Sequence, residues 1–380
     1  MSGPEPACLV IADISGYTGY LAGVELDHAQ DILLDLVSTV VGAMRPMLKL
    51  SKLEGDAAFA YVVTPTIEGS TLQETVEGTY FAFRRRLRDI ASASRCECNA
   101  CIRIPNLDLK VVVHHGPVIR QRIAGHDELL GSSVILVHRL LKNDVVESTG
   151  IKAYALYTAD CVAAMGIEDP ARQGFVEHRV ATDVAGEITT WLRDLETAWE
   201  DEQSRTRTLV EGKNVEAVFP FTSPAARQVT WDYFTSPIRR PQWNADAIIE
   251  ESPTGRRGTG TVNHCIHGRD AIIEEILDYR PYDYLTVRSQ VPAPGAPKLV
   301  HSYVFTDDPA GTLVELRIAK PKPRDRAAFD QLLVVLAGMI EHNAQGIMPL
   351  LEAEAAAARS GDGVDIPASK GRFETEPVTA

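Results

Sequence analysis

The chain changes its pattern of apolar residues near residue 200, and this change constrains the fold more than any other feature. Before it, strand-like apolar runs such as 8–14 alternate with amphipathic helical patterns such as 29–48. After it, strand-like runs follow one another until one long helical pattern, 324–354, which would be roughly 45 Å long at 1.5 Å per residue. These patterns predict an α+β fold made of two domains.

The stretch between the two patterns, residues 196–207, is dense in charged residues and poor in apolar ones. We therefore expect a linker there, between a first domain at 1–195 and a second at 208–356. The tail at 357–380 is rich in glycine, proline and charge, and we expect it to be disordered.

Charge and hydropathy exclude several classes of partner. The net charge is -14 with lysines and arginines scattered along the chain, which argues against nucleic acid or a membrane surface as the main partner. No segment approaches the ~20 uninterrupted apolar residues of a membrane span. The sequence thus favours a cytoplasmic protein, and its six cysteines are too few for a disulfide framework.

Two aspartates lie at predicted strand ends. Asp13 follows the apolar run 8–12, and Asp56 lies in the turn of a predicted hairpin at 50–63. Either residue alone is typical of a turn or a cap. On adjacent strand ends of one sheet, however, two carboxylates can share divalent cations, because Mg²⁺ and Mn²⁺ prefer oxygen ligands. The turn at 15–18 would then offer backbone N–H groups to an anion.

The segments that carry these aspartates are "DISGYTGYL" (13–21) and "KLEGDAAFAYV" (52–62), followed by "KVVVHHGPVI" (110–119) and "LLGSSVILVHRL" (129–140). In this order and spacing they resemble the catalytic domain of class III nucleotidyl cyclases over residues 7–195. The resemblance implies a ferredoxin-like cyclase homology domain that acts as a homodimer on a nucleoside triphosphate. It also implies metal ligands, which are Asp13, the Ile14 carbonyl and Asp56, and a phosphate cradle at Gly16, Tyr17 and Thr18.

The same resemblance assigns roles to three further residues. Lys52 matches the lysine that reads the base, Glu128 falls where cyclases acting on ATP hold a proton acceptor, and Arg139 matches the arginine that stabilises charge at the α-phosphate. A Lys/Glu pair suits adenine better than guanine. Two departures count against turnover: Ile135 replaces the asparagine that orients the ribose, and the phosphate-binding lysine before 186–192 has no counterpart.

A cysteine cluster follows the second helical pattern. Cys96, Cys98 and Cys101 lie within six residues, and three thiolates with an imidazole as fourth ligand can close a tetrahedral zinc site. The alternative is a reduced, cysteine-rich loop. The spacing itself is not a common zinc-finger pattern. His114, which matches the strand histidine of the cyclase family, is expected to be packed rather than to bind the metal.

The second half carries the pattern of a helix-grip fold: a helix, antiparallel strands and one long final helix. The segments "WDYFTSPIRRPQW" (231–243), "GRRGTGTVNHCIHG" (255–268) and "EEILDYRPYDYLTV" (274–287) resemble the START-like superfamily over residues 208–354. The resemblance implies an apolar cavity for a hydrophobic small molecule. We expect its lining to include Trp231, Phe234, Trp243, His264, Tyr303 and Phe305, although each aromatic taken alone is more typical of core.

Three functions fit these features. The first is an enzyme that makes a cyclic nucleotide, ATP being the favoured substrate, under control of a ligand in the START-like domain. The second is a sensor that binds a nucleotide and a small molecule without turnover. The third makes the START-like half the enzyme, but no nucleophile, base and orienting group can be picked out there.

Overall fold

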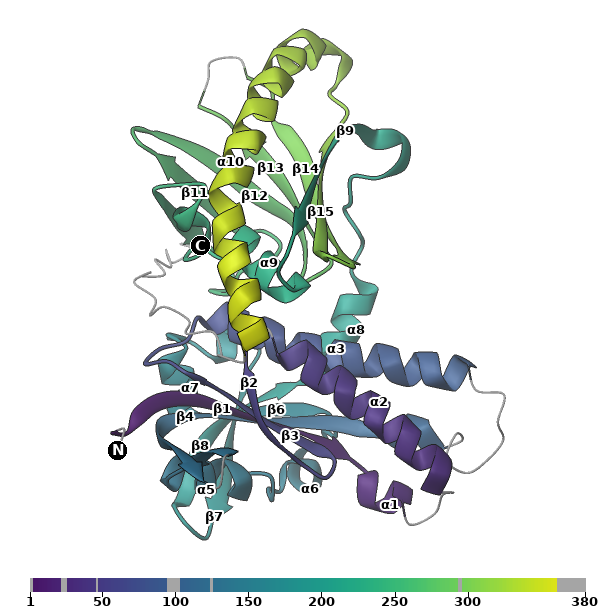
Figure 1. Cartoon of the computed structure of the whole chain (residues 1–380), viewed down its shortest axis with the longest axis vertical. Coiled ribbons are helices and arrows are strands. Elements are labelled where there is room, and N and C mark those ends of the chain that lie inside the picture. Colours follow the sequence, from purple (N-terminus) through teal and green to yellow (C-terminus); the bar gives the residue numbers. More distant parts are fainter. Residues whose placement is uncertain are drawn as a thin grey trace. The chain divides into compact units, whose positions relative to one another are not determined.

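The computed structural model describes residues 3–21, 26–45, 47–93, 103–123, 126–292 and 296–360. These described residues divide into two compact units, one ending at Ser204 and the other beginning at Arg205 (Figure 1). The α+β prediction is confirmed. No helix in the described ranges is long and apolar enough to cross a membrane. Of the predicted tail, residues 357–360 belong to the last helix and residues 361–380 lie outside the described residues.

The first unit is built around one mixed sheet. Its elements in chain order are β1 (Glu5–Ser15), α1 (Tyr17–Leu21), α2 (Leu26–Met44), β2 (Lys49–Glu54), β3 (Ala57–Val63), α3 (Gly69–Ala93), β4 (Asp108–Ile123), β5 (His126–Leu130), α5 (Ser132–Arg139), α6 (Val145–Thr149), β6 (Tyr154–Thr158), α7 (Ala159–Ala164), β7 (Val176–Thr182), β8 (Gly186–Asp194) and α8 (Leu195–Ser204). The strand order is β2-β3-β1-β4-β6-β8-β7, and β5 pairs with β4 beside this path.

The apolar run of β1 explains the centre of this sheet. Residues 7–12 are at most 1% exposed, because β1 lies between β3 and β4 and has a core on each face. One core contains Val10, Leu36 on α2 and Leu72 on α3. The other contains Leu9 and Val137 on α5. The candidate site lies at the end of β1, on the face that α5 covers.

Helix α8 occupies most of the stretch where a linker was expected. Its Leu195 and Ala198 are buried in the first unit's core, and Glu196 bonds to the Tyr80 hydroxyl and, at 2.9 Å, to Arg84 on α3. These contacts explain why a segment so rich in charge folds with the first unit. Its first acidic residue, Glu196, pairs with side chains of that unit.

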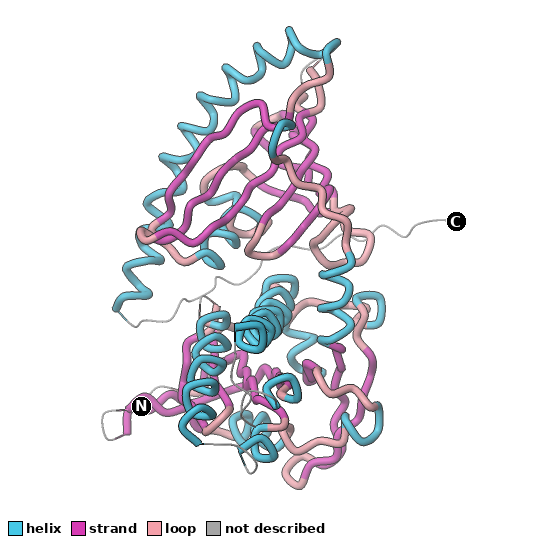
Figure 2. Tube along the Cα trace, turned by 90° about the vertical axis from the view of Figure 1, so that its right-hand side faces the viewer, coloured by secondary structure: helices cyan, strands magenta, loops and turns pink. Residues whose placement is uncertain are grey.

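The second unit is a seven-stranded antiparallel sheet with a long helix across it (Figure 2). Its elements are β9 (Val215–Ser223), α9 (Arg227–Thr235), a 3-10 turn at Arg240–Gln242, β10 (Ala247–Glu251), β11 (Val262–His267), β12 (Asp270–Arg280), β13 (Tyr284–Gln290), β14 (Leu299–Asp308), β15 (Gly311–Ala319) and α10 (Arg326–Ser360). The strand order is β10-β11-β12-β13-β14-β15-β9.

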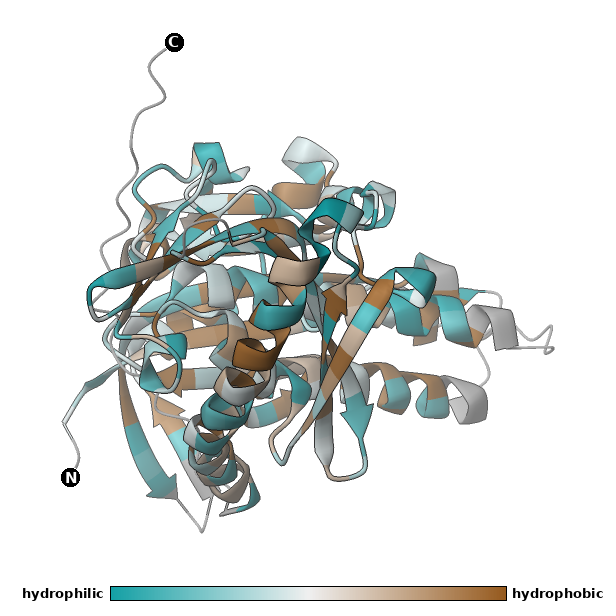
Figure 3. Cartoon of the chain, turned by 90° about the horizontal axis from the view of Figure 1, so that it is seen from above, coloured by the Kyte–Doolittle hydropathy of each residue, from teal (hydrophilic) through white to brown (hydrophobic). Residues whose placement is uncertain are grey.

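The apolar spacing of α10 fixes how it packs. Phe329, Ile347 and Leu351 are buried against the sheet, and the helix spans 35 residues, about 52 Å at 1.5 Å per residue. Coloured by hydropathy, brown apolar segments alternate with teal hydrophilic ones along the helices and strands (Figure 3). This alternation is what elements that bury a single face require.

Candidate functional site

The pairing of β1 with β3 brings the two aspartates together. Asp13 lies opposite Ala57 in the antiparallel register, so Asp56, one residue earlier in the β2–β3 turn, reaches the end of β1. The backbone N–H of Ile14 donates to the carbonyl oxygen of Asp56 over 3.4 Å. Two residues about forty positions apart in the sequence thus become neighbours, and the carboxylates are close enough for the charge of Asp13 to raise the pKa of Asp56.

Lys110 on β4 lies beside this pair. It is opposite Asp13 in the sheet, and its Nζ lies 3.1 Å from Asp13 Oδ2, with the two side chains only 22% and 18% exposed. The same ammonium donates to the carbonyl oxygen of Leu141 over 3.4 Å. Lys110 could not be picked out from the sequence, because only the strand register shows which residue faces Asp13.

The donor chemistry of the cluster fits a hard divalent cation. Two carboxylates and the Ile14 carbonyl are oxygen ligands. Burial, together with the negative charge of Asp13, raises the pKa of Asp56 above its usual range even with the Lys110 ammonium nearby, so further positive charge here would be favourable. Across the described ranges, no group of three or more His, Cys, Asp or Glu side chains is placed to hold a metal. A metal at this cluster would therefore need oxygens from its substrate as well.

The turn after β1 depends on a glycine. Gly16 has φ +86, and a Cβ there would lie 3.1 Å from the carbonyl oxygen of Asn106. A larger residue would therefore be strained and crowded. Tyr17 then begins α1. The side chain of Thr18 is outside the described part of the structure.

The residues that the cyclase resemblance assigns to the base and to the α-phosphate have partners of their own. Lys52 Nζ lies 3.1 Å from Glu54 Oε1, and His138 Nε2 lies 3.0 Å from the other oxygen of Glu54. Arg139, at the end of α5, pairs with Asp183 at 3.5 Å, and both side chains are exposed. These residues form pairs separate from the Asp13 cluster.

Two other positions bear on substrate orientation. Ile135 on α5 is 53% exposed, so the apolar residue in place of the family's asparagine faces solvent. Glu128 on β5 lies opposite Gln121 of β4 and is half-buried. The structure thus brings Asp13, Ile14 and Asp56 together, and it does not add Glu128 or Arg139 to them.

The three cysteines expected to bind zinc, Cys96, Cys98 and Cys101, are outside the described residues. His114 is 3% exposed, with Nδ1 2.9 Å from Thr158 Oγ1. Burial lowers its pKa to about 4, as expected for a neutral imidazole packed in the sheet.

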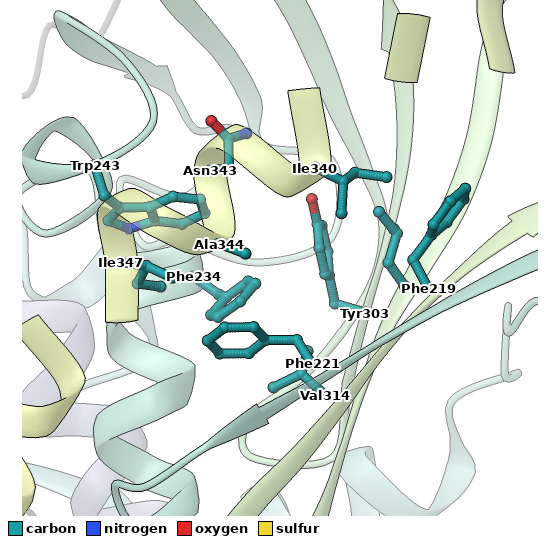
Figure 4. A pocket seen from close by; sticks show the side chains of 11 residues that line it. Phe219, Phe221, Phe234, Trp243, Tyr303, Val314, Ile340, Asn343, Ala344 and Ile347 are labelled. Carbon is teal, nitrogen blue, oxygen red and sulfur yellow. The ribbon is translucent and has the colours of Figure 1, made fainter. Parts of the chain in front are cut away.

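The second unit contains a hollow between α10 and the sheet (Figure 4). It measures about 420 Å³ including space open to solvent, and about 50 Å³ of it has room for the centres of water molecules. Its lining is mostly aromatic and aliphatic: Phe219, Phe221, Phe234, Trp243, Tyr303, Val314, Leu316, Ile340, Asn343, Ala344 and Ile347. The smaller volume is the one comparable with known sites, and it lies below their usual range of about 300–1,000 Å³, so a bound ligand would extend into the part of the hollow that is open to solvent.

Three of the six expected lining residues, Phe234, Trp243 and Tyr303, face this hollow. The other three lie elsewhere. Trp231 and Phe305 are fully buried and pack on each other with ring centroids 5.1 Å apart, because both belong to the core beneath α9. His264 lies outside this lining, with its Nε2 3.1 Å from a carboxylate oxygen of Glu251 on β10.

The part of the lining that comes from β9 was not predicted from the sequence. Phe219 and Phe221 of this strand line the hollow. Phe219 and Phe221 alternate with Pro220, which is the period of a strand, but a proline within the run argues against a strand when only the sequence is read. Proline is tolerated here because β9 is at the edge of the sheet that the described residues form, where it pairs with β15.

Comparisons with known proteins gave one family and several structures. Residues 33–149 match the family described as a protein of unknown function, DUF2652. The uncharacterized protein Rv2561/Rv2562 of Mycobacterium tuberculosis (strain ATCC 25618 / H37Rv) is 34% identical over 167 residues, which are 44% of this chain and 74% of that protein.

Similar solved structures include two cyclases. The guanylyl cyclase Cya2 is 12% identical with a TM-score of 0.37, over 50% of this chain and 92% of its own. The adenylyl cyclase CyaB from P. aeruginosa is 11% identical with a TM-score of 0.33, over 50% of this chain and 97% of its own.

Proposed function

This chain belongs to the family of the Mycobacterium tuberculosis protein Rv2561/Rv2562. For this member of the family we propose that the first unit binds a purine nucleoside triphosphate, ATP preferred, at Asp13 and Asp56. The observation that carries the proposal is the neighbouring carboxylate pair at the end of β1, with Lys110 beside it. The four sequence segments that resemble class III cyclases support the same site.

The proposed chemistry is formation of a cyclic nucleotide. Asp13, Asp56 and the Ile14 carbonyl would hold Mg²⁺ or Mn²⁺, which supplies charge to the triphosphate and acidifies the ribose 3′-hydroxyl. The 3′-oxygen then bonds to the α-phosphorus, pyrophosphate leaves and one proton is released. The backbone N–H groups after Gly16 would orient the phosphates.

Two residues proposed to act on the substrate must first leave partners in their own chain. The Arg139–Asp183 pair is long, at 3.5 Å, and exposed, so it contributes at most ~1 kcal/mol. Lys52 is 43% exposed, and its pair with Glu54 is likewise near the surface. Breaking either pair therefore costs little free energy. In a homodimer, Lys52 and Arg139 would come from the second copy.

A second candidate is nucleotide binding without turnover. The observation that favours it is the exposed Ile135, which can make no hydrogen bond to a ribose. Loss of one such contact slows a reaction by on the order of 10²–10³. For the second unit we propose binding of a hydrophobic small molecule in the hollow beneath α10, with its occupancy regulating the first unit.

Incubation of the full chain with Mn²⁺ and each nucleoside triphosphate, followed by mass spectrometry of the products, tests the proposal. We expect a cyclic product that is lost in Asp56→Asn and retained in Asp201→Asn, a control at an exposed position of α8. Binding without product, with the same dependence on Asp56, would favour the second candidate. Product that persists in Asp56→Asn would refute the metal assignment.

A further inference from the structure

One wall of the hollow borders a buried polar cluster in the second unit. Arg240 makes two hydrogen bonds to Glu274 of β12, at 2.7 and 3.2 Å, and the two side chains are 8% and 13% exposed. The paired charges cancel within the protein. The cluster therefore offers no spare charge to a ligand, even though it contains an arginine.

His301 and Tyr303 connect this cluster to the hollow. They lie two residues apart on β14, and hence on the same face of the strand, with ring centroids 5.4 Å apart and edge to face. Tyr303 lines the hollow. His301 is 6% exposed, and within the described ranges its Nδ1 has no hydrogen-bond partner. A buried polar atom without a partner is uncommon and points to a missing one.

Both side chains are uncharged at neutral pH. Burial lowers the pKa of His301 to about 4. Burial, followed by the negative charge of Glu274, raises the pKa of Tyr303 to about 12. The tyrosine hydroxyl can donate a hydrogen bond, and the imidazole can accept or donate one according to its tautomer.

The rest of the lining gives no countercharge. Apart from Tyr303 and the amide of Asn343, the lining contains apolar and aromatic side chains, five of its members being aromatic. An ionised ligand group would lose its hydration here at a cost of several kcal/mol. Aromatic walls favour aromatic ligands, because offset and edge-to-face ring contacts add to apolar burial.

We propose that the hollow beneath α10 selects an uncharged aromatic molecule that carries a hydroxyl or carbonyl group, with Tyr303 as its direct polar contact and His301 as the second polar group behind it. The inference rests on the proposed ligand-binding role of the second unit and adds the chemical class of the ligand. Tyr303 thereby becomes a specificity-determining residue, and His301 a positioning residue.

Three probes of one shape test the inference: naphthalene, 2-naphthol and 2-naphthoate, each titrated against the full chain by calorimetry. We expect 2-naphthol to bind about tenfold more tightly than naphthalene, the value of roughly one hydrogen bond, and 2-naphthoate not to bind. Tyr303→Phe should remove the preference for naphthol and leave naphthalene binding unchanged. Tyr282→Phe, a tyrosine that packs on Trp231 outside the lining, should change neither.

His301→Gln keeps hydrogen-bonding atoms but moves them, and we expect it to weaken naphthol binding and spare naphthalene. Binding of 2-naphthoate as tight as that of 2-naphthol would overturn the inference. Equal binding of naphthalene and naphthol would overturn it too, and would leave the apolar-ligand role intact. Failure of all three probes would refute that role and the inference with it.

Discussion

Replacing Ala344 by leucine would fill the hollow beneath α10 from its helical wall. Ala344 faces the hollow, and leucine forms helices nearly as readily as alanine, so the main effect is on packing. Filling about 50 Å³ at about 24 cal/mol per Å³ corresponds to a gain of about 1 kcal/mol. For a unit of this size that gain raises the melting temperature by about 2–4 °C.

Thermal unfolding of the full chain, with and without 2-naphthol, measures this effect. We expect Ala344→Leu to melt higher than the wild type and to lose the stabilisation that 2-naphthol gives. The control is Ala337→Leu at an exposed position of the same helix, which should alter neither quantity. A lower melting temperature with ligand stabilisation intact would refute the reasoning, because leucine would then have overpacked a site that does not hold the ligand.

Three further perturbations test separate parts of the account. Lys110→Met removes the ammonium beside the Asp13–Asp56 pair, so we expect a loss of about 1–2 kcal/mol in unfolding free energy at pH 7. Denaturant titration should show this loss shrinking as the pH falls, because the Asp56 carboxyl, whose pKa burial raises, takes up its proton. Burial lowers the pKa of His114 to about 4 in the folded protein, against about 6.5 when the chain is unfolded. The free energy of unfolding should therefore fall by up to about 3 kcal/mol as the pH drops from about 6.5 to about 4. His114→Gln should flatten this pH dependence, and an unchanged slope would contradict a buried, neutral His114. Trp231→Ala, at a side chain 1% exposed, should cost about 3–5 kcal/mol in the second unit and leave nucleotide binding by the first unchanged, as dialysis would show.

Much of the fold follows from apolar periodicity. The run that became β1 is buried on both faces, and the spacing in α10 predicted one helix across a sheet. Apolar periodicity did not predict helix α8, because charge on this helix is compensated by contacts with the rest of the first unit. The charged stretch 196–207 was predicted to be a linker, and Glu196 within it instead pairs with Arg84 on α3.

The candidate site was predictable in part. Both aspartates could be picked out because they end adjacent strand patterns. Lys110 could not, because its approach to Asp13 depends on the register between β1 and β4. The polar cluster behind Tyr303 was missed for the same reason: Glu274 and His301 lie on different strands, and only the folded sheet brings them near one hollow.

The most direct test of the central claim is equilibrium dialysis of labelled ATP with the full chain, with Mn²⁺ or with EDTA. We expect saturable binding that requires Mn²⁺, weakens at least tenfold in Asp13→Asn and in Asp56→Asn, and is unchanged in Asp201→Asn. Equal ATP affinity in EDTA, or in either carboxylate variant, would contradict it.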